Sequence, residues 1–127
     1  MRITKNITEE FIDERGGIAK VLDDGATAIK SILRITSKKG AIRSNHYHKK
    51  DSHYCYLESG ALEYYERPVN GRKIKKAVLA KGDMVFTPPL MVHGMKFLED
   101  SVLWAFATRS RDQKDYEKDT VRIALIS

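Results

Sequence analysis

The stretch HYHKKDSH, residues 46–53, holds three of the four histidines of this 127-residue chain within eight positions. Residues two apart on a β-strand point to the same face, so we expect His46 and His48 to project side by side. A four-residue turn then leads to His53, which can come to lie opposite that pair. The fourth histidine, His93, follows forty residues later, after a Pro-Pro break. This arrangement suits chelation of a metal ion.

Outward from this stretch, short β-prone runs alternate with turn residues from Ile18 onward, which is typical of an all-β barrel or sandwich. The runs cover residues 29–36, 53–58, 61–66, 73–80, 84–87, 92–97 and 101–107. We predict roughly nine or ten strands and little helix. Residues 1–15 are expected to form an N-terminal arm or a short helix, residues 109–120 a polar segment and residues 121–126 a C-terminal strand.

Composition and length indicate one globular domain spanning residues 1–127, because 42% of the residues are hydrophobic and 31% are charged. No apolar run approaches the roughly 18 residues that a membrane span needs. The N-terminus lacks the features of a secretory signal, and a single cysteine, Cys55, excludes an internal disulfide. We therefore expect a cytoplasmic protein that does not bind membranes.

The net charge of +6 favours anionic partners such as phosphorylated metabolites and nucleotide-sugars. Much of the excess lies in residues 72–76, which are typical of a solvated hairpin strand. The sequence contains no helix-turn-helix, zinc-finger or RNA-binding signature. We expect a small-molecule substrate and no nucleic acid.

The spacing of the histidines resembles the two sequence motifs of the cupin superfamily. The first motif, in which a glycine precedes His-x-His, an acidic residue and a second glycine, is matched in spacing by Gly40, His46, His48, His53 and Gly60. The second motif is matched by Gly82, Pro88 and His93. Three positions differ from the family pattern: His53 replaces Glu, Leu90 replaces Gly and Phe97 replaces Asn.

The resemblance implies a double-stranded β-helix, the jelly-roll barrel of the cupins, with a metal centre inside. We predict that His46, His48, His53 and His93 bind one divalent transition metal, which the sequence leaves open among Mn, Fe, Ni, Cu and Zn. A histidine in place of the acidic ligand leaves the ion its full charge and makes it a stronger Lewis acid. The function expected first is therefore that of a metal-dependent enzyme of the dioxygenase or isomerase type.

Two alternatives stay open. Residues 42–49 are similar to the Arg-Gly-x-His-Ala-His-Lys segment of cupin-fold nucleotide-sugar ketoisomerases. That resemblance implies isomerase or epimerase chemistry in which histidines move protons without a metal. The third hypothesis is a non-catalytic cupin that binds a small ligand, because one fold hosts many functions.

Five further residues are candidates for contact with a substrate. Alternation from His53 and His93 places Cys55, Met95 and Phe97 inside the barrel, where Cys55 is foremost a small buried hydrophobe. Arg43 and Lys50 flank the histidines and suit a carboxylate or phosphate. We also expect a homodimer formed by edge strands, with residues 121–126 and the N-terminal segment as the candidates.

Overall fold

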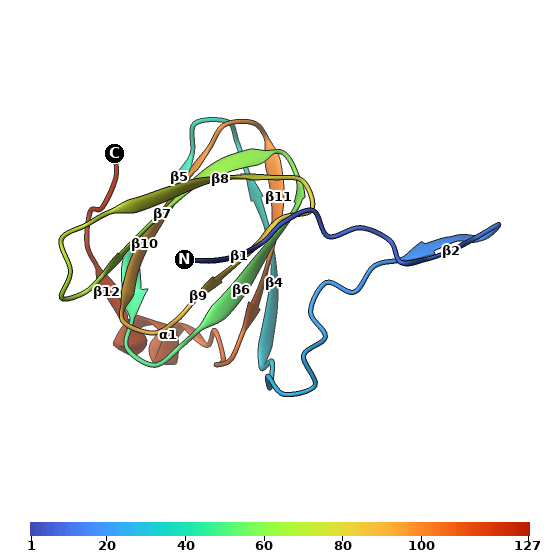
Figure 1. The fold of residues 1–127 in the computed structure, drawn as a ribbon. Helices are drawn as coiled ribbons and strands as arrows, with labels where there is room; N and C mark the ends of the chain where they lie inside the picture. The colour runs from blue at the N-terminus through green and yellow to red at the C-terminus, as the bar shows by residue number, and fades with distance from the viewer.

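Two five-stranded antiparallel sheets face each other across an apolar core (Figure 1). The computed structural model describes residues Met1–Ser127. The first sheet has the order β1 (Arg2–Thr4), β9 (Met84–Thr87), β6 (His53–Ser59), β11 (Ser101–Ala107), β4 (Ser31–Ser37). The second has the order β12 (Thr120–Arg122), β5 (Ile42–His48), β10 (Met91–Phe97), β7 (Ala61–Pro68), β8 (Lys75–Ala80).

Strict alternation of side chains builds the core. On β6, Cys55 and Leu57 are buried, while Tyr54 and Tyr56 are only half-buried and Glu58 is exposed, which confirms the alternation predicted for this strand. The same period buries every second residue of β7 and β11. Ten buried residues make one cluster: Cys55, Leu57, Leu62, Tyr64, Leu79, Val85, Met95, Phe97, Leu103 and Ala105. Burying each large apolar side chain contributes about 1.5–3 kcal/mol.

The structure confirms the all-β fold class, and it corrects the predicted ends of the chain. There are twelve strands rather than nine or ten, because the short strands β1, β2 (Phe11–Asp13), β3 (Gly16–Ile18) and β12 add to the longer ones. No helix forms in residues 1–15. Instead, β2 and β3 pair as a hairpin that projects away from the barrel (Figure 1).

The C-terminal region also differs from the prediction. The polar segment 109–120 contains the helix α1 (Gln113–Asp119), whose N-cap Asp112 accepts a hydrogen bond from the Lys114 amide. The predicted strand 121–126 is wrong in extent, because β12 covers only Thr120–Arg122. Beyond it, the Asn45 side chain accepts hydrogen bonds from the amides of Leu125 and Ile126, so these amides take no part in a ladder. No helix of the structure has the length and apolar character that crossing a membrane requires.

A bulge in β5 decides which side chains of this strand face the interior. Across from β10, His46 pairs with His93 and Ser44 pairs with Gly94, so Asn45 is the extra residue. Asn45 has a φ of 55°, a left-handed conformation that asparagine tolerates. Gly94 permits the close approach, because a Cβ there would lie 2.9 Å from the Asn45 side-chain oxygen. The bulge shifts the alternation by one residue, so that Arg43 faces the same side as His46.

Candidate functional site

The four histidine rings gather between the two sheets. His46 and His48 come from β5 and His93 from the neighbouring β10, whereas His53 comes from β6 in the opposite sheet. The ring centroids of His46 lie 4.6 Å from His48 and 4.8 Å from His93. The centroid of His53 lies 5.1 Å from His93 and 5.8 Å from His48. The structure thus brings together all four histidines that the sequence singled out.

Hydrogen bonds fix the tautomers of two of these rings. Nδ1 of His93 lies 2.9 Å from the Met91 carbonyl oxygen, which can only accept, so Nδ1 carries the proton. Nδ1 of His48 lies 3.2 Å from the Thr120 hydroxyl, and this hydroxyl donates to the Tyr116 carbonyl and therefore accepts from His48. In both rings the free lone pair is on Nε2.

These two Nε2 atoms, on His48 and His93, are buried and have no hydrogen-bond partner. Leaving a buried polar atom unpaired costs about 1–3 kcal/mol, so native proteins rarely do so without a reason. Two unpaired acceptors in one cluster indicate a place where a ligand binds.

Burial keeps the four imidazoles neutral. Loss of water is the largest cause and lowers the pKa of His46 to about 2 and that of His48 and His93 to about 4. The pKa of His53 also falls well below its ordinary value because the ring is buried. The positive charge of Arg111 lowers all four further, while Asp119 acts in the opposite direction on His48. At neutral pH the rings are therefore proton acceptors or metal ligands, not cations.

The rings of His46, His48 and His53 line a cavity of about 150 Å³, and His93 is not among its lining residues. Of the five predicted substrate contacts, Arg43, Cys55 and Met95 line it, while Lys50 is exposed outside it and Phe97 is buried in the core. Burial raises the pKa of the Cys55 thiol to about 12, so the thiol stays protonated, with its sulfur 3.4 Å from Nδ1 of His53. The remaining wall is largely apolar and includes Ile35, Leu103 and Ala105.

The C-terminal segment contributes residues that the sequence did not single out. Arg111 and Tyr116 line the cavity, and the Tyr116 ring centroid lies 5.5 Å from that of His48. Asp119 Oδ2 lies 3.7 Å from Nδ1 of His48, and the two carboxylate oxygens accept the amides of Lys50 and Asp51. One sequence signal could have identified them. Tyr116 is the only aromatic residue in a charged run and precedes Asp119 by three positions, so the two residues share one face of a helix.

The histidines fit a metal ion chemically. The candidate ligand atoms of His46, His48 and His93 lie within 4.8 Å of one another. Nitrogens bound to one ion at about 2.0–2.1 Å in tetrahedral geometry are about 3.4 Å apart, so the rings would have to move closer together to hold an ion. The hydrogen bonds from Nδ1 of His48 and His93 are of the kind that orient metal-bound imidazoles. His53 lies outside this group, with Nδ1 directed at Cys55.

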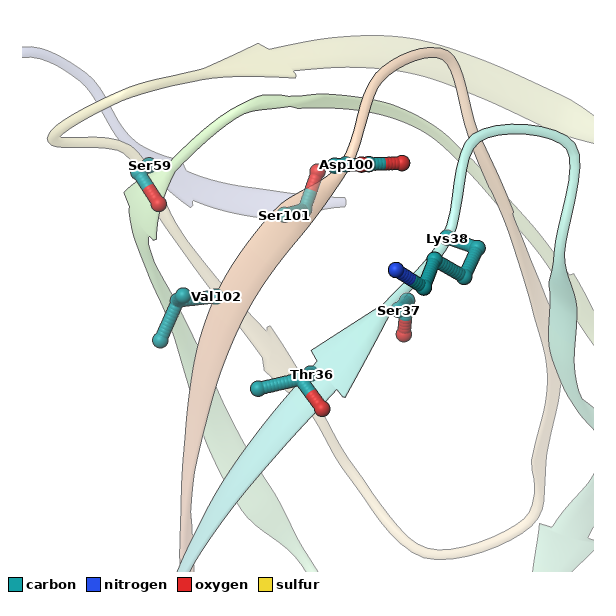
Figure 2. Close-up of a pocket in the computed structure, with 7 residues that line it drawn as sticks. All are labelled: Thr36, Ser37, Lys38, Ser59, Asp100, Ser101 and Val102. Atoms are coloured by element: carbon teal, nitrogen blue, oxygen red, sulfur yellow. The ribbon is translucent and has the colours of Figure 1, made fainter.

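A larger depression of about 310 Å³ lies at the opposite end of the barrel. Its lining is mainly hydroxyl-bearing and consists of Thr36, Ser37, Lys38, Ser59, Asp100, Ser101 and Val102 (Figure 2). Its two most buried hydroxyls already have internal partners, because Ser101 donates to the Glu99 carbonyl and Ser37 accepts from Arg43. With no buried titratable group, this depression offers no acid–base or metal chemistry.

Comparison with known proteins identifies the fold. No protein-family model matches the sequence, and no curated protein matches it. Among solved structures, a 3,4-ketoisomerase from Helicobacter canadensis is similar at a TM-score of 0.77 and 22% identity, over 95% of this chain and 89% of that one. The rmlC epimerase of Mycobacterium tuberculosis has a TM-score of 0.78 and 15% identity, over 95% and 68%.

Two further structures show the same likeness. The dTDP-4-dehydrorhamnose 3,5-epimerase of Sulfolobus tokodaii has a TM-score of 0.73 and 23% identity, over 91% of this chain and 73% of that one. The capsular polysaccharide assembling protein CapF from Staphylococcus aureus has a TM-score of 0.69 and 22% identity over 76% of this chain, which spans only 27% of the CapF chain. The barrel has the cupin fold, in the form found in these epimerases and ketoisomerases.

Proposed function

We propose that this chain is an isomerase or epimerase that moves protons on a keto-sugar linked to a nucleotide. The observation that carries the proposal is a base and an acid on one cavity. His48 presents a buried lone pair on Nε2 with Asp119 behind Nδ1, and the Tyr116 phenol borders the same cavity. Several similar structures are named as enzymes of this class.

The proposed chemistry needs one base and one acid. Neutral His48 accepts through Nε2 the proton of a carbon next to the sugar carbonyl, and Asp119 stabilises the imidazolium that forms. The Tyr116 phenol donates a proton to the carbonyl oxygen, which gives an enediol. In isomerisation, His48 delivers its proton to the former carbonyl carbon, and the Tyr116 phenolate takes the proton of the other enediol hydroxyl, which becomes the new carbonyl. In epimerisation, the Tyr116 phenolate takes back the proton of the enediol oxygen and Tyr116 delivers it to the opposite face of the original carbon, and His48 releases its proton to water, from which the phenolate regains one.

The size of the cavity limits what enters it. The cavity, at about 150 Å³, is small enough that a sugar ring would occupy it and a linked nucleotide would lie outside. Arg43 lines this cavity, is itself exposed, and donates hydrogen bonds to the Ser37 hydroxyl and the Thr36 carbonyl. A guanidinium held in this way suits the diphosphate of the substrate.

Calorimetry with thymidine diphosphate tests the substrate class. We expect binding in the micromolar range that weakens about tenfold or more in Arg43→Gln and is unchanged in Arg34→Gln, an exposed arginine near Trp104 on the outer face. Absence of binding by the unaltered protein contradicts a nucleotide-linked substrate.

A metal-dependent reaction is the second candidate, and the three-histidine group favours it. His46, His48 and His93 would hold the ion, with His53 beside them. A bound divalent ion supplies Lewis acidity toward a carbonyl oxygen. Elemental analysis of protein purified without a histidine tag separates the candidates: one bound transition metal per chain, with activity lost on chelation, supports this one, and full activity without metal excludes it.

We further propose that the chain forms a homodimer through its N-terminal hairpin. The side chains of Phe11, Ile12 and Ile18 on β2 and β3 are 56%, 72% and 63% exposed, and the hairpin stands clear of its own barrel (Figure 1). Ile32 on the edge strand β4 is 62% exposed and offers a second copy an apolar contact. Sedimentation should show a dimer that Ile12→Ser weakens, and a monomer alone would refute the proposal.

A further inference from the structure

Arg111 is held in place at the wall of the histidine cavity. Its guanidinium carbon lies 4.8 Å from the centroid of the Tyr116 ring, and Nε lies 3.5 Å from Oδ2 of Asp51. The Arg111 side chain is only 20% exposed. A planar cation fixed between an aromatic face and a carboxylate has lost most of its rotamer freedom before any ligand arrives.

The guanidinium nevertheless lacks the acceptors that it needs. Nε is buried and makes no hydrogen bond, although it forms an ion pair with Oδ2 of Asp51. Asp51 instead accepts a hydrogen bond from the Thr108 hydroxyl. A half-buried guanidinium that lines a cavity and has a donor without a hydrogen-bond partner can bind an acceptor there.

The chemistry of the cavity favours an anionic acceptor. Two cations line it, Arg43 and Arg111, and no carboxylate is among its lining residues. Arg43 already donates to Ser37 and Thr36, whereas Nε of Arg111 has no hydrogen-bond partner. The influence of Arg111 on the pKa of each histidine places its charge within reach of the whole cluster.

We propose that Arg111 is a second anion-binding residue of this cavity, distinct from Arg43, and holds a negatively charged oxygen of the ligand beside the histidines. Guanidinium groups bind oxyanions through two parallel N–H donors. In the isomerase or epimerase reaction, the oxygen is the former carbonyl oxygen, on which negative charge develops when the neighbouring carbon loses its proton. This identity of the oxygen rests on the proposed function; the anion site itself does not.

Inorganic phosphate is the probe for the site, because it has the charge and fits the cavity. The metal-free protein, labelled with ¹⁵N, is titrated with phosphate at pH 7 while the Nε–H resonances of the arginines are followed. We expect a saturable shift of the Arg111 resonance and an apparent affinity that falls at least tenfold in Arg111→Gln. Arg111→Lys keeps the charge and should give an intermediate loss, which covers the case that Arg111→Gln does not fold.

Arg109→Gln is the matched control. Arg109 lies two residues earlier, is exposed and does not line the cavity, so its variant should bind phosphate within twofold of the unaltered protein. A phosphate response at Arg109 and not at Arg111, equal losses in both variants, or no response at all overturns the inference. A response at Arg111 without binding of thymidine diphosphate leaves the anion site standing and removes the proposed function.

Discussion

The two ends of the barrel differ in backbone strain and in chemistry. At the end that holds the hydroxyl-lined depression, the turns that need a left-handed backbone use Gly40, Gly60 and Gly82, with φ values of 87°, 95° and 92°. At the histidine end, Leu90 takes a φ of 62° although it is not a glycine.

The two ends of the barrel also differ in whether their buried polar groups are hydrogen-bonded. The depression at the glycine end is about twice as large, and its most buried hydroxyls are hydrogen-bonded. The histidine cavity is smaller, yet one of its lining residues, His48, has an unpaired Nε2, and the neighbouring His93 ring has another. Strain and unpaired polar groups tend to concentrate where a protein functions. In this barrel, strain and unpaired polar groups point to the histidine cavity as the functional site. A comparison of the two volumes alone would instead favour the hydroxyl-lined depression.

The largest difference between the two ends is expected in turnover. His48→Asn removes the proposed base and should lower kcat on a nucleotide-linked keto-sugar by about 10²–10⁴-fold, the usual contribution of a general base. Ser59→Ala at the opposite end should leave kcat within about twofold, because Ser59 lies in the depression without buried chemistry. Steady-state kinetics of both variants checks the comparison, and equal losses would break it.

Asp119 should act through His48. Asp119→Asn is expected to lower kcat by about 10–100-fold, the effect of losing a partner that orients an imidazole. Because the carboxylate raises the pKa of His48, the acid limb of the kcat–pH profile should also move to lower pH. Asp115→Asn, on an exposed position of α1, is the control. A profile that does not move would show a purely structural role.

The buried histidines should also determine how the stability of the protein falls in acid. The unfolded imidazole has a pKa of about 6.5, whereas His48 and His93 have pKa values of about 4 in the fold. As the pH falls, protons bind the unfolded chain first. The free energy of unfolding should therefore be constant above pH 6.5 and should fall between pH 6.5 and 4, by up to about 1.4 kcal/mol per pH unit for each histidine.

Urea denaturation at pH 7.5, 6.5 and 5.5 measures this slope. His93→Gln removes one of the buried imidazoles and should make the dependence shallower by roughly one histidine's share. A slope that the variant leaves unchanged would place the acid sensitivity outside the cluster.

The smallest effect is expected from backbone strain. Leu90 is 55% exposed, so Leu90→Gly loses little packing and relieves a left-handed conformation, which should raise stability by about 0.5–1 kcal/mol. Leu98→Gly, an exposed leucine at the opposite end with an ordinary φ, should instead lower stability by a similar amount. Thermal unfolding of the pair checks both signs.

The sequence predicted what strand alternation and motif spacing control. The long strands and the meeting of the four histidines follow from side chains that alternate every second residue. The bulge at Asn45 could not be predicted from strand alternation. It depends on the close approach of Gly94 and on the hydrogen bonds that Asn45 makes with the C-terminal backbone. Arg111, Tyr116 and Asp119 were missed because the charged run around them has the composition of a solvated segment. Their role arises only when α1 packs beside the end of β5.

Deuterium exchange tests most directly whether the cavity histidines move a proton on a keto-sugar. The chelator-treated protein is incubated in D₂O with nucleoside-diphosphate 4-keto-hexoses, and NMR follows deuterium at the carbons next to the carbonyl. We expect incorporation by the unaltered protein, with His48→Asn slower by at least 10²-fold. Incorporation that requires an added metal would support the metal-dependent alternative. Incorporation that His48→Asn leaves unchanged, or none under either condition, would contradict the account.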